Sequence, residues 1–300
     1  MAFARTAAMS KCQHMPGMLY IIATPIGNLE DITQRALRIL GEVDLIACED
    51  TRHTRKLLNH FGINKTTISY HEHNERERAA ELCDLLEGGK NLGLVSDAGT
   101  PLINDPGFRI VQAAIERGIS VVSVPGPSAV VTALAASGLP TDTFFFGGFL
   151  PARASARRAK LEQVLAFPGT LVFYEAPHRI AKTLKDALNV LGDRAAAVGR
   201  ELTKIHEEFV RGKLSELAKH FSENRPVRGE IVLMISGAHP DQAPSTSATN
   251  TSVQLMDRVR FLEQRGLNSK DALKTAGREL GLKRGEAYRL MVAQKNRRNK

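Results

Sequence analysis

Two carboxylates stand in a loop of small residues and prolines, S-D-A-G-T-P-L-I-N-D-P-G, at 96–107. The loop follows an apolar run at 92–95 and precedes a helical pattern that begins near Phe108. A loop between a strand and a helix often binds phosphate, but this one holds Asp97 and Asp105 and neither lysine nor arginine. Its charge therefore favours a cationic or uncharged ligand whose hydroxyl or amino groups can donate to an acceptor.

Three further loops of small and polar residues follow predicted strands: T-P-I-G-N at 24–28, P-G-P-S-A-V at 125–130 and F-Y-E-A-P-H-R at 173–179. In open α/β sheets, ligands bind at the carboxyl ends of the strands. Neither the G-x-G-x-x-G of dinucleotide sites nor G-x-x-x-x-G-K is present. Each loop alone can be an ordinary turn or helix cap. Together they suit S-adenosylmethionine, which carries a sulfonium cation, a ribose diol and an adenine.

Alternating apolar runs and amphipathic stretches predict the elements that carry these loops, in a chain of the α/β class. The first block has expected strands at 19–24, 44–48, 67–70, 92–96 and 121–124. Its expected helices are 32–40, 51–61, 75–87 and 108–117. This alternation predicts a mostly parallel sheet covered by helices.

The turn formers G-L-P-T-D at 138–142 predict the start of a second α/β domain with some antiparallel pairing. Its expected strands are 143–147, 170–174, 195–198, 207–210 and 230–236, and its expected helices are 157–165, 180–191 and 211–221. Three short helices, 253–264, 269–280 and 283–293, resemble a helix-turn-helix, the second capped by Ser269. The predicted limits are a disordered extension at 1–17, domains at 18–138 and 139–237, a linker at 238–252 and a helical unit at 253–295.

Composition restricts the class of protein. No apolar run approaches the roughly 18 residues that a membrane span needs, so no membrane partner is expected. The three cysteines form no C-x-x-C pair, which favours a reducing, cytoplasmic setting with Cys48 and Cys83 buried as small apolar residues. Residues 251–300 carry a net charge of +8, from thirteen Lys and Arg against five Asp and Glu. Such a tail favours a polyanionic partner, although a solvated helix face is the alternative.

Six segments together resemble the ribosomal RNA small subunit methyltransferase I family of the tetrapyrrole methylase superfamily: TPIGNLEDIT, EDTRHTRKLL, LVSDAGTPLINDPG, VPGPSAV, FYEAPHR and GRELTKIHEE. The resemblance runs from about Met18 to Gly237. It implies 2′-O-methylation of a cytidine in the decoding region of 16S ribosomal RNA, with S-adenosylmethionine as cofactor and the small ribosomal subunit as partner. It also implies a homodimer whose subunits hold the cofactor between two domains. TPIGN replaces the glycine-rich first loop of the tetrapyrrole relatives, as expected in the RNA-methylating branch.

The resemblance also implies which residues line the cofactor site, since its motifs can be matched position by position. The implied cofactor residues are Pro25, Ser96, Asp97, Ala98, Gly99, Thr100, Pro101, Asp105, Ser128, Ala129, Tyr174 and Leu233.

A ribose hydroxyl is a poor nucleophile while protonated, so a base should accept its proton. The candidate bases or orienting groups are Glu175, Glu201, Lys204 and His206. Lys204 would need a depressed pKa, and Glu201 can instead hold it as an ion pair. The alternative is that GRELTKIHEE is an exposed segment with ordinary surface charge.

Basic residues on two predicted helices could contact RNA phosphates. They are Arg52, Arg55 and Lys56 in the first domain, with Arg157 and Arg158 in the second. Arg52 could equally pair with Asp50, and the second group could be a solvated helix face. A metal site at H-E-H, 71–73, is not expected, since no further ligand has suitable spacing. Few aromatics are available for stacking, which favours recognition of the RNA by its shape, by its backbone and by a flipped-out nucleotide.

Two other functions stay open from the sequence. A tetrapyrrole precursor could be the methyl acceptor, or the chain could bind nucleic acid without catalysis. The basic tail and TPIGN count against the first, and four polar loops at one sheet edge count against the second.

Overall fold

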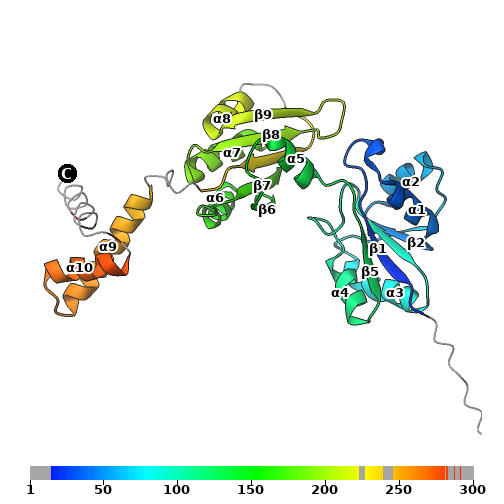
Figure 1. Cartoon of the computed structure of the whole chain (residues 1–300), viewed down its shortest axis with the longest axis horizontal. Helices are drawn as coiled ribbons and strands as arrows, with labels where there is room; N and C mark the ends of the chain where they lie inside the picture. Colours follow the sequence, from blue (N-terminus) through cyan, green and yellow to red (C-terminus); the bar gives the residue numbers. More distant parts are fainter. Residues whose placement is uncertain are drawn as a thin grey trace, which may run out of the picture.

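The computed structural model describes residues 15–222, 227–238 and 246–280, together with 282, 287 and 291 (Figure 1). The first domain is built on five parallel strands in the order β3-β2-β4-β1-β5. The strands are β1 Met18–Ile22, β2 Leu45–Cys48, β3 Thr67–Ser69, β4 Leu92–Val95 and β5 Ser120–Val124. The helices are η1 Leu29–Asp31, α1 Gln34–Glu42, α2 Thr51–His60, α3 Glu75–Glu87 and α4 Phe108–Glu116.

Helices cover both faces of this sheet because its strands are apolar on both sides. Leu92 and Leu94 of β4 pack with α3 and α4, whereas the next residue, Val95, packs with α1 and α2. The buried Cys48 and Cys83 belong to these two clusters, as predicted. The order of strands brings the carboxyl ends of β1, β4 and β5 together, and the loops that follow these three strands therefore meet.

The second sheet has the order β6-β7-β10-β8-β9, in which only the β6–β7 pair is parallel. Its strands are β6 Phe144–Phe149, β7 Thr170–Glu175, β8 Ala195–Arg200, β9 Glu208–Lys213 and β10 Ile231–Ile235. Its helices are α5 Ala129–Ser137, α6 Ala154–Gln163, α7 Ile180–Leu191 and α8 Leu214–Ser222. The parallel first sheet and mixed second sheet confirm the predicted fold class.

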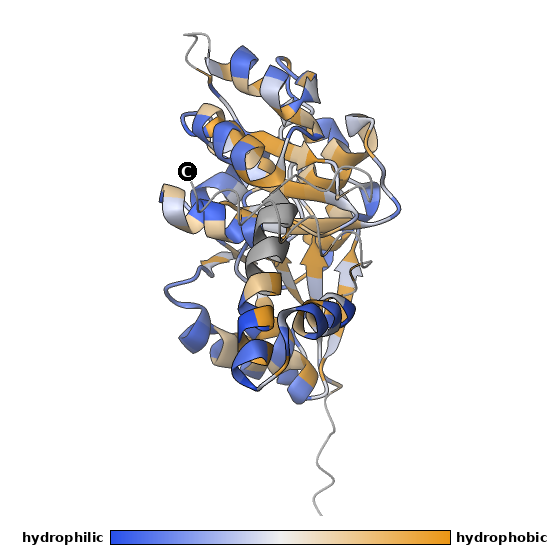
Figure 2. Cartoon of the chain, turned by 90° about the vertical axis from the view of Figure 1, so that its left-hand side faces the viewer, coloured by the Kyte–Doolittle hydropathy of each residue, from blue (hydrophilic) through white to orange (hydrophobic). Residues whose placement is uncertain are grey.

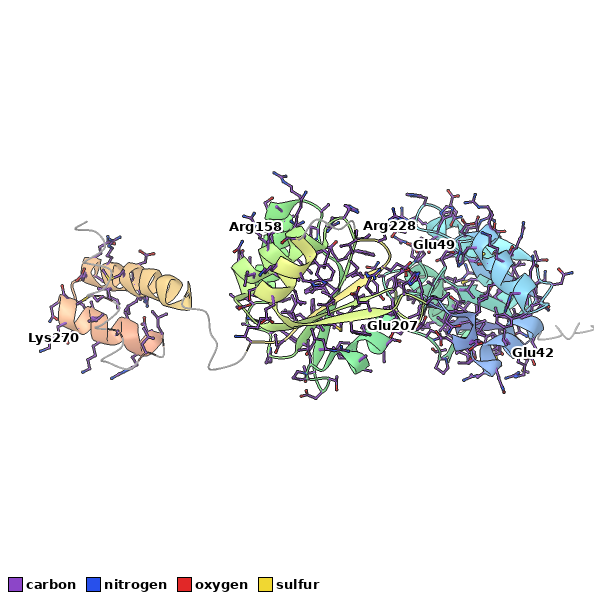
Figure 3. The ribbon with its side chains drawn as sticks, turned by 90° about the horizontal axis from the view of Figure 1, so that it is seen from above. Glu42, Glu49, Arg158, Glu207, Arg228 and Lys270 are labelled. Atoms are coloured by element: carbon purple, nitrogen blue, oxygen red, sulfur yellow. The ribbon has the colours of Figure 1, made fainter. Side chains whose placement is uncertain are left out.

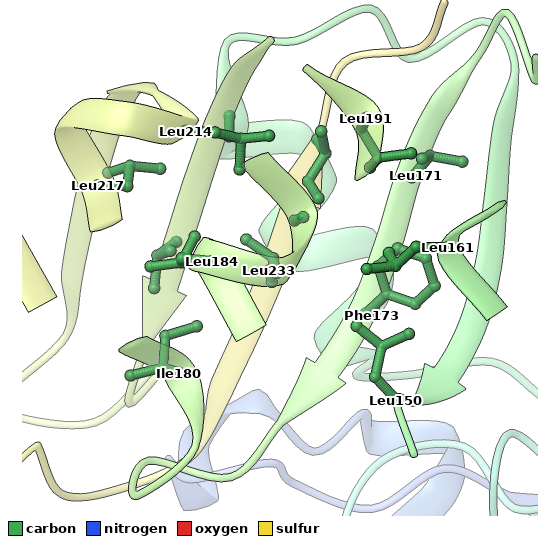
Figure 4. Close-up of a cluster of buried hydrophobic side chains, with 14 of the residues drawn as sticks. Leu150, Leu161, Leu171, Phe173, Ile180, Leu184, Leu191, Leu214, Leu217 and Leu233 are labelled. Carbon is green, nitrogen blue, oxygen red and sulfur yellow. The ribbon is translucent and has the colours of Figure 1, made fainter. Parts of the chain in front are cut away.

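The two faces of β10 belong to different clusters. Ile231, Leu233 and Ile235 pack against α6, α7 and α8 in the cluster drawn in Figure 4. Val232 and Met234 point to the other face, where they meet α5. Figure 2 shows the apolar strands enclosed by helices that alternate between apolar and polar residues.

The structure differs from the sequence analysis at two places in this region. Helix α5 was not predicted, and it packs on β8 and β10, so the chain joins the second layer before the expected boundary at 138. The helix expected at 211–221 begins only at Leu214, because β9 continues its antiparallel pairing with β8 as far as Lys213. Both errors come from tertiary pairing, which overrides local pattern.

The C-terminal unit contains α9 Thr246–Gln264 and α10 Ser269–Glu279, which pack together through Leu255, Val259 and Ala276. Helix α9 begins inside the predicted linker, and α10 is capped by the Asn268 side chain, which accepts from the Asp271 amide, rather than by Ser269. The predicted third helix lies outside the described residues except at 287 and 291, as does the predicted extension except at 15–17. Within the described residues, no helix has the length and apolar character to cross a membrane.

Candidate functional site

A cavity of about 370 Å³ lies where the loops of the two sheets meet. Its size is in the range of small-molecule sites. The first domain lines it with Ile26, Ala98, Gly99, Thr100, Ile103, Asn104 and Asp105, followed by Ser128 and Ala129 at the start of α5. The second domain lines it with Phe149, Tyr174, Glu175, Ala176, Pro177, Leu202, Gly229, Glu230, Ile231 and Val232. No lysine or arginine is among these lining residues.

Main-chain hydrogen bonds join the three loops of the first domain. The Thr24 amide donates to the Gly99 carbonyl (2.9 Å), and the Gly99 amide donates back to Thr24 (3.0 Å). The Thr100 hydroxyl donates to the carbonyl of Pro127 (3.2 Å). Gly99 has φ of 84°, and a Cβ at this position would lie close to Ile26. A residue with a side chain would therefore be strained here. This network fixes the floor of the cavity before any ligand binds.

The second half of the 96–107 loop holds strained backbone. Leu102 and Asn104 have φ of 72° and 70°, a region that residues with a side chain seldom adopt. A Cβ on Gly148 would lie 2.5 Å from the Asn104 Oδ1 atom, so this glycine lets β6 approach the loop. The second domain therefore holds the strained turn that presents Asp105.

The two aspartates of the loop have different surroundings. Asp97 is not a lining residue, and its carboxylate accepts the amide N–H of Asp50 (3.1 Å), which ties the end of β4 to the end of β2. Asp105 lines the cavity and is half-buried. Burial, and then the negative charge of Asp97, raise the pKa of Asp105, although a hydrogen bond from Ser96 partly opposes this. The carboxylate at the cavity is thus Asp105, although the sequence pattern did not distinguish it from Asp97.

The end of β7 supplies a buried ionic network. Glu175 is 1 % exposed and accepts hydrogen bonds from the Thr183 hydroxyl (2.5 Å) and the Ala176 amide (2.8 Å). Arg179 lies 3.0 Å from the same carboxylate and also donates to the Leu150 carbonyl. Because the Glu175 oxygens are fully engaged inside the domain, they do not fit the expected role of a base.

Aromatic side chains form the neighbouring wall. The Tyr174 ring packs edge-on against Phe146 and lies 5.5 Å from the Phe149 ring. Phe149 is 54 % exposed although it lines the cavity, so it forms an apolar rim together with Ile103. Burial raises the pKa of Tyr174 to about 12, helped by the charges of Asp105 and Glu230. The phenol therefore stays protonated and can donate a hydrogen bond.

Loop 201–207 contributes Leu202 to the cavity lining and forms a compact ion-pair cluster with Glu230, which also lines the cavity. Lys204 Nζ lies 2.8 Å from Glu201 and 3.2 Å from Glu230. Glu201 also accepts the Glu230 amide, and its bond with Lys204 holds the pKa of its carboxyl below the usual range. Partial burial opposes the charge of Lys204, but hydrogen bonds with Glu201 and the Glu230 carboxylate raise the Lys204 pKa overall. Lys204 is therefore a cation, and the depressed pKa that a base requires is absent.

Glycines allow this cluster to form. A Cβ on Gly27 would lie 2.5 Å from the Cγ of Lys204, and one on Gly229 would lie 2.4 Å from the Cδ of Glu201. Glu201 and Thr203 have φ of 51° and 63°, so this loop, like 96–107, is strained next to the cavity.

The structure brings together most of the expected cofactor residues but not all of them. Those that line the cavity are Ala98, Gly99, Thr100, Asp105, Ser128, Ala129 and Tyr174. Those that do not are Pro25, Ser96, Asp97, Pro101 and Leu233. Leu233 points into the far cluster because strand residues alternate, and its neighbour Val232 lines the cavity instead. A signal for Val232 was available in that alternation, whereas nothing in the sequence singled out Phe149 or Gly229.

The basic residues expected to contact RNA differ in whether they form ion pairs within the protein. Arg55 and Lys56 are exposed on α2, whereas exposed Arg52 pairs with Asp50 (2.8 Å), which lowers the Asp50 pKa to about 2. Arg157 is 3 % exposed, and its guanidinium is bound by Asp186 and two carbonyls, so it does not fit a phosphate contact. Arg158, labelled in Figure 3, remains exposed although it shares Asp186.

Within the described ranges, no group of three side chains is arranged to hold a metal ion. His71 and His73 lie with their ring centres 5.9 Å apart, and the His71 ring contacts Asn74.

Comparison with known proteins shows which proteins share this architecture. A sequence profile of the Tetrapyrrole (Corrin/Porphyrin) Methylases matches residues 18–218. Diphthine synthase shares the fold with a TM-score of 0.57 at 15 % identity, over 74 % of this chain and 90 % of that one. Uroporphyrin-III C-methyl transferase from Thermus thermophilus, solved with S-adenyl homocysteine, aligns with a TM-score of 0.51 at 20 % identity, over 73 % and 97 % of the two chains.

The fold and the profile define a methyltransferase of the tetrapyrrole methylase family, to which this chain belongs. Proteins named ribosomal RNA small subunit methyltransferase I are much closer in sequence. That of Halalkalibacterium halodurans is 46 % identical over 91 % of this chain and 94 % of its own length, and that of Escherichia coli O157:H7 is 46 % identical over 93 % and 96 %. Within the superfamily, the chain is a member of the ribosomal RNA small subunit methyltransferase I family, and the resemblance predicted from its motifs is confirmed.

Proposed function

We propose that this protein transfers a methyl group to the 2′ oxygen of a cytidine in the decoding region of 16S ribosomal RNA. The cofactor of this reaction is S-adenosylmethionine. The observation that carries the proposal is the cavity between the sheets, which combines apolar walls and a carboxylate and has no lysine or arginine among its lining residues. The relatives named above act, by their names, on the RNA of the small ribosomal subunit.

The residues present fit this cofactor. The loops at 98–100 and 128–129 offer main-chain groups and the hydroxyls of Thr100 and Ser128 to its ribose and amino-acid portions. Ile26, Leu202 and Val232 offer an apolar surface to the adenine ring. The negative charge of the site suits a sulfonium, and a phosphate-binding cation is not needed. When bound, the cofactor supplies the methyl group on a good leaving group, so the protein mainly orients the acceptor.

The negative charge of the cavity also favours one class of methyl acceptor over another. A uroporphyrin-type acceptor carries several carboxylates, which would meet Asp105 and Glu230 without a compensating lining cation. A ribose hydroxyl is neutral, and the phosphates of its strand can stay outside, near the exposed Arg55, Lys56 and Arg158. These side chains, with the basic C-terminal unit, form the proposed RNA surface.

Transfer of tritiated methyl groups tests the assignment. Small subunits from cells that lack the enzyme are expected to accept the label, and digestion of their RNA should yield 2′-O-methylcytidine. A 2′-deoxycytidine at the target should abolish transfer. Label found only in a base-methylated nucleoside, or only in a tetrapyrrole precursor, would overturn the proposal.

Three associated expectations are proposals of the same kind. The protein is proposed to be cytoplasmic, to act as a homodimer and to hold RNA partly through the exposed cations of α2. Sedimentation equilibrium checks the dimer. Replacing Arg55 by Gln should reduce the slope of log affinity against log salt by about 1, whereas Arg35→Gln, on exposed α1, should leave it unchanged.

A further inference from the structure

The outward face of α10 carries three cations at a spacing of four residues: Lys270, Lys274 and Arg278. Ala272 and Ala276 of the same helix are buried against α9. Because an α-helix has 3.6 residues per turn, positions 270, 274 and 278 share one face, on the side away from these alanines. All three cations are exposed, and Lys270 is labelled in Figure 3. These three residues form the α10 stripe.

The carboxylates of α9 and α10 have other partners, which are cations or hydrogen-bond donors outside the α10 stripe. These pairs are Glu279 with Arg258, Asp257 with Arg260, Glu263 with Ser269 and Asp271 with Asn268. Within the described residues, no member of the stripe forms an ion pair. The three positive charges are therefore not neutralised by the carboxylates of their own unit.

The stability of α10 does not explain the stripe. Like charges four residues apart on a helix repel each other, and the stripe contains two such neighbours in a row. Lys270 also stands in the first turn, where the helix dipole disfavours a cation. Helix α1 shows the stabilising arrangement, since Arg38 pairs with Glu42 four residues later (2.7 Å). A stripe that opposes the stability of its helix indicates a negatively charged partner outside the chain.

We infer that the α10 stripe binds the phosphate backbone of the substrate RNA and holds it without selecting its sequence. The inference rests on the proposed function and adds to it a defined contact surface with a stated mode of binding. At a rise of about 1.5 Å per residue the stripe is about 12 Å long, enough to contact more than one phosphate. Helix α10 has no aromatic residue on which a base could stack.

The shape of RNA favours contact with phosphates over contact with bases. The second helix of a helix-turn-helix reads bases in the major groove of DNA. The major groove of double-stranded RNA is too deep and narrow for side chains to read. Lysine and arginine on an exposed helix face instead bind phosphates, which fixes the position of the RNA and carries no sequence information.

An acidic protein surface is the alternative partner, and the surroundings of the stripe count against it. Protein interfaces have an apolar centre. Helix α10 is described along its whole length, and none of the exposed large apolar side chains lies on it. Asp271 and Thr275 flank the stripe instead. Charge without apolar area fits a phosphate backbone better than a protein.

The test compares two full-length variants that lose the same charge. The stripe variant carries Lys270→Gln, Lys274→Gln and Arg278→Gln. The control variant removes three exposed cations from α7 and α8: Lys182→Gln, Lys185→Gln and Lys219→Gln. Helices α7 and α8 pack on the face of β10 that holds Leu233, whereas Val232, on the other face, lines the cavity.

Binding to protein-free 16S ribosomal RNA is measured over a range of salt concentrations. In the stripe variant the slope of log affinity against log salt should fall by about 2–3, because each lost phosphate contact removes nearly one unit. The control variant should keep the parent slope. A charge-preserving variant with Lys270→Arg, Lys274→Arg and Arg278→Lys should also keep it.

Kinetics and stability supply the second readout. The KM for small subunits should rise about tenfold or more in the stripe variant. The kcat and the affinity for S-adenosylhomocysteine should stay within about threefold of the parent, because no stripe residue lines the cavity. The melting temperature should equal or exceed that of the parent, since repulsion within α10 is removed.

Three results would overturn the inference. The first is a slope that the stripe variant leaves unchanged or that the control lowers equally. The second is a lower melting temperature with an unchanged slope, which assigns the stripe to folding. The third is weaker binding to small subunits with unchanged binding to protein-free RNA, which assigns it to a ribosomal protein. A parent that binds RNA but transfers no methyl group overturns the proposed function alone, because the slopes still decide the contact.

Discussion

Two strained loops, one from each domain, contribute residues to the cavity lining, and both contain carboxylates. Loop 96–107 of the first domain leaves Asp105 without a cation, whereas loop 201–207 of the second surrounds Lys204 with Glu201 and Glu230. Each loop is approached by a left-handed glycine of the second domain, Gly148 for the first and Gly229 for the second.

The two loops differ in whether their charged side chains form ion pairs. An ion pair lowers the reactivity of both partners, since the charged form of each is stabilised by the other. The cluster at Lys204 therefore belongs to the wall of the site, whereas Asp105 presents to the cavity a carboxylate that forms no ion pair within the described residues. Figure 3 shows Glu49 on the first domain and Arg228 and Glu207 on the second, so charged side chains of both domains stand near their junction.

The largest effect is expected for Glu175→Gln, which removes a charge from the buried ionic network of the second domain. It should lower the free energy of unfolding by about 3–5 kcal/mol, because Arg179 keeps a largely buried charge without its partner. Urea unfolding measures this loss. Glu230→Gln is the control, since that side chain is mostly exposed and should change stability by about 1 kcal/mol or less. Equal losses would show that burial does not distinguish the two glutamates.

Gly229→Ala tests the backbone of the second loop. Its φ of 90° disfavours any side chain, and the new Cβ would collide with Glu201, so the loss should be about 2–3 kcal/mol. Gly118→Ala separates the two causes, because Gly118 has φ of 70° with open space around it. Thermal melts should show a clearly smaller loss for Gly118→Ala. If both variants melt alike, the contact with Glu201 contributes nothing.

Phe149→Ala tests whether the second domain contacts the substrate through an apolar ring rather than through ionisable groups. Loss of an exposed ring at the cavity should weaken RNA binding by about 1–3 kcal/mol, the range for stacking of a base on an aromatic side chain. Filter binding at fixed salt gives the affinity. Phe144→Ala, on the same strand and exposed but outside the cavity, should bind RNA as the parent does. A change in both or in neither would remove Phe149 from the substrate site.

The smallest expected effect belongs to Lys204→Met. The pair it removes is partly exposed, so its loss should cost about 0.5–1 kcal/mol of stability. The folded pKa of Glu201 is lowered, so this stability is present above the ordinary glutamate pKa and is lost as the pH falls through the folded value. Denaturation at pH 7 and at acid pH should therefore differ for the parent more than for the variant.

Much of the fold followed from local pattern. The runs at 92–95 and 170–174 are apolar enough to be buried strands, and the loops after them were correctly placed at the edge of a sheet. Helix α5 was missed because its apolar residues follow a proline-rich loop and find their partners on β8 and β10, more than sixty residues later. Pattern within a window carries no information about such partners.

The sequence predicted which loops form the candidate site, but it did not predict which side chains line the cavity or which groups they contact. Arg157 was expected at RNA and instead pairs with Asp186, 29 residues away, inside the second domain. Asp97 and Asp105 are equivalent in a sequence, yet one binds the Asp50 amide and the other lines the cavity. Each outcome depends on which distant group approaches the side chain.

The sequence by itself determined the alternation of strands and helices, the place of the polar loops and the membership of the family, because these reside in periodicity and in short motifs. Only the tertiary structure decided which carboxylate is free. An ion pair or hydrogen bond to a residue distant in the chain changes the pKa and accessibility of a group without changing its neighbours in sequence. Lys204 is a fixed cation because Glu201 and Glu230 of its own domain surround it, whereas Asp105 lines the cavity in a loop that Gly148 of the second domain approaches.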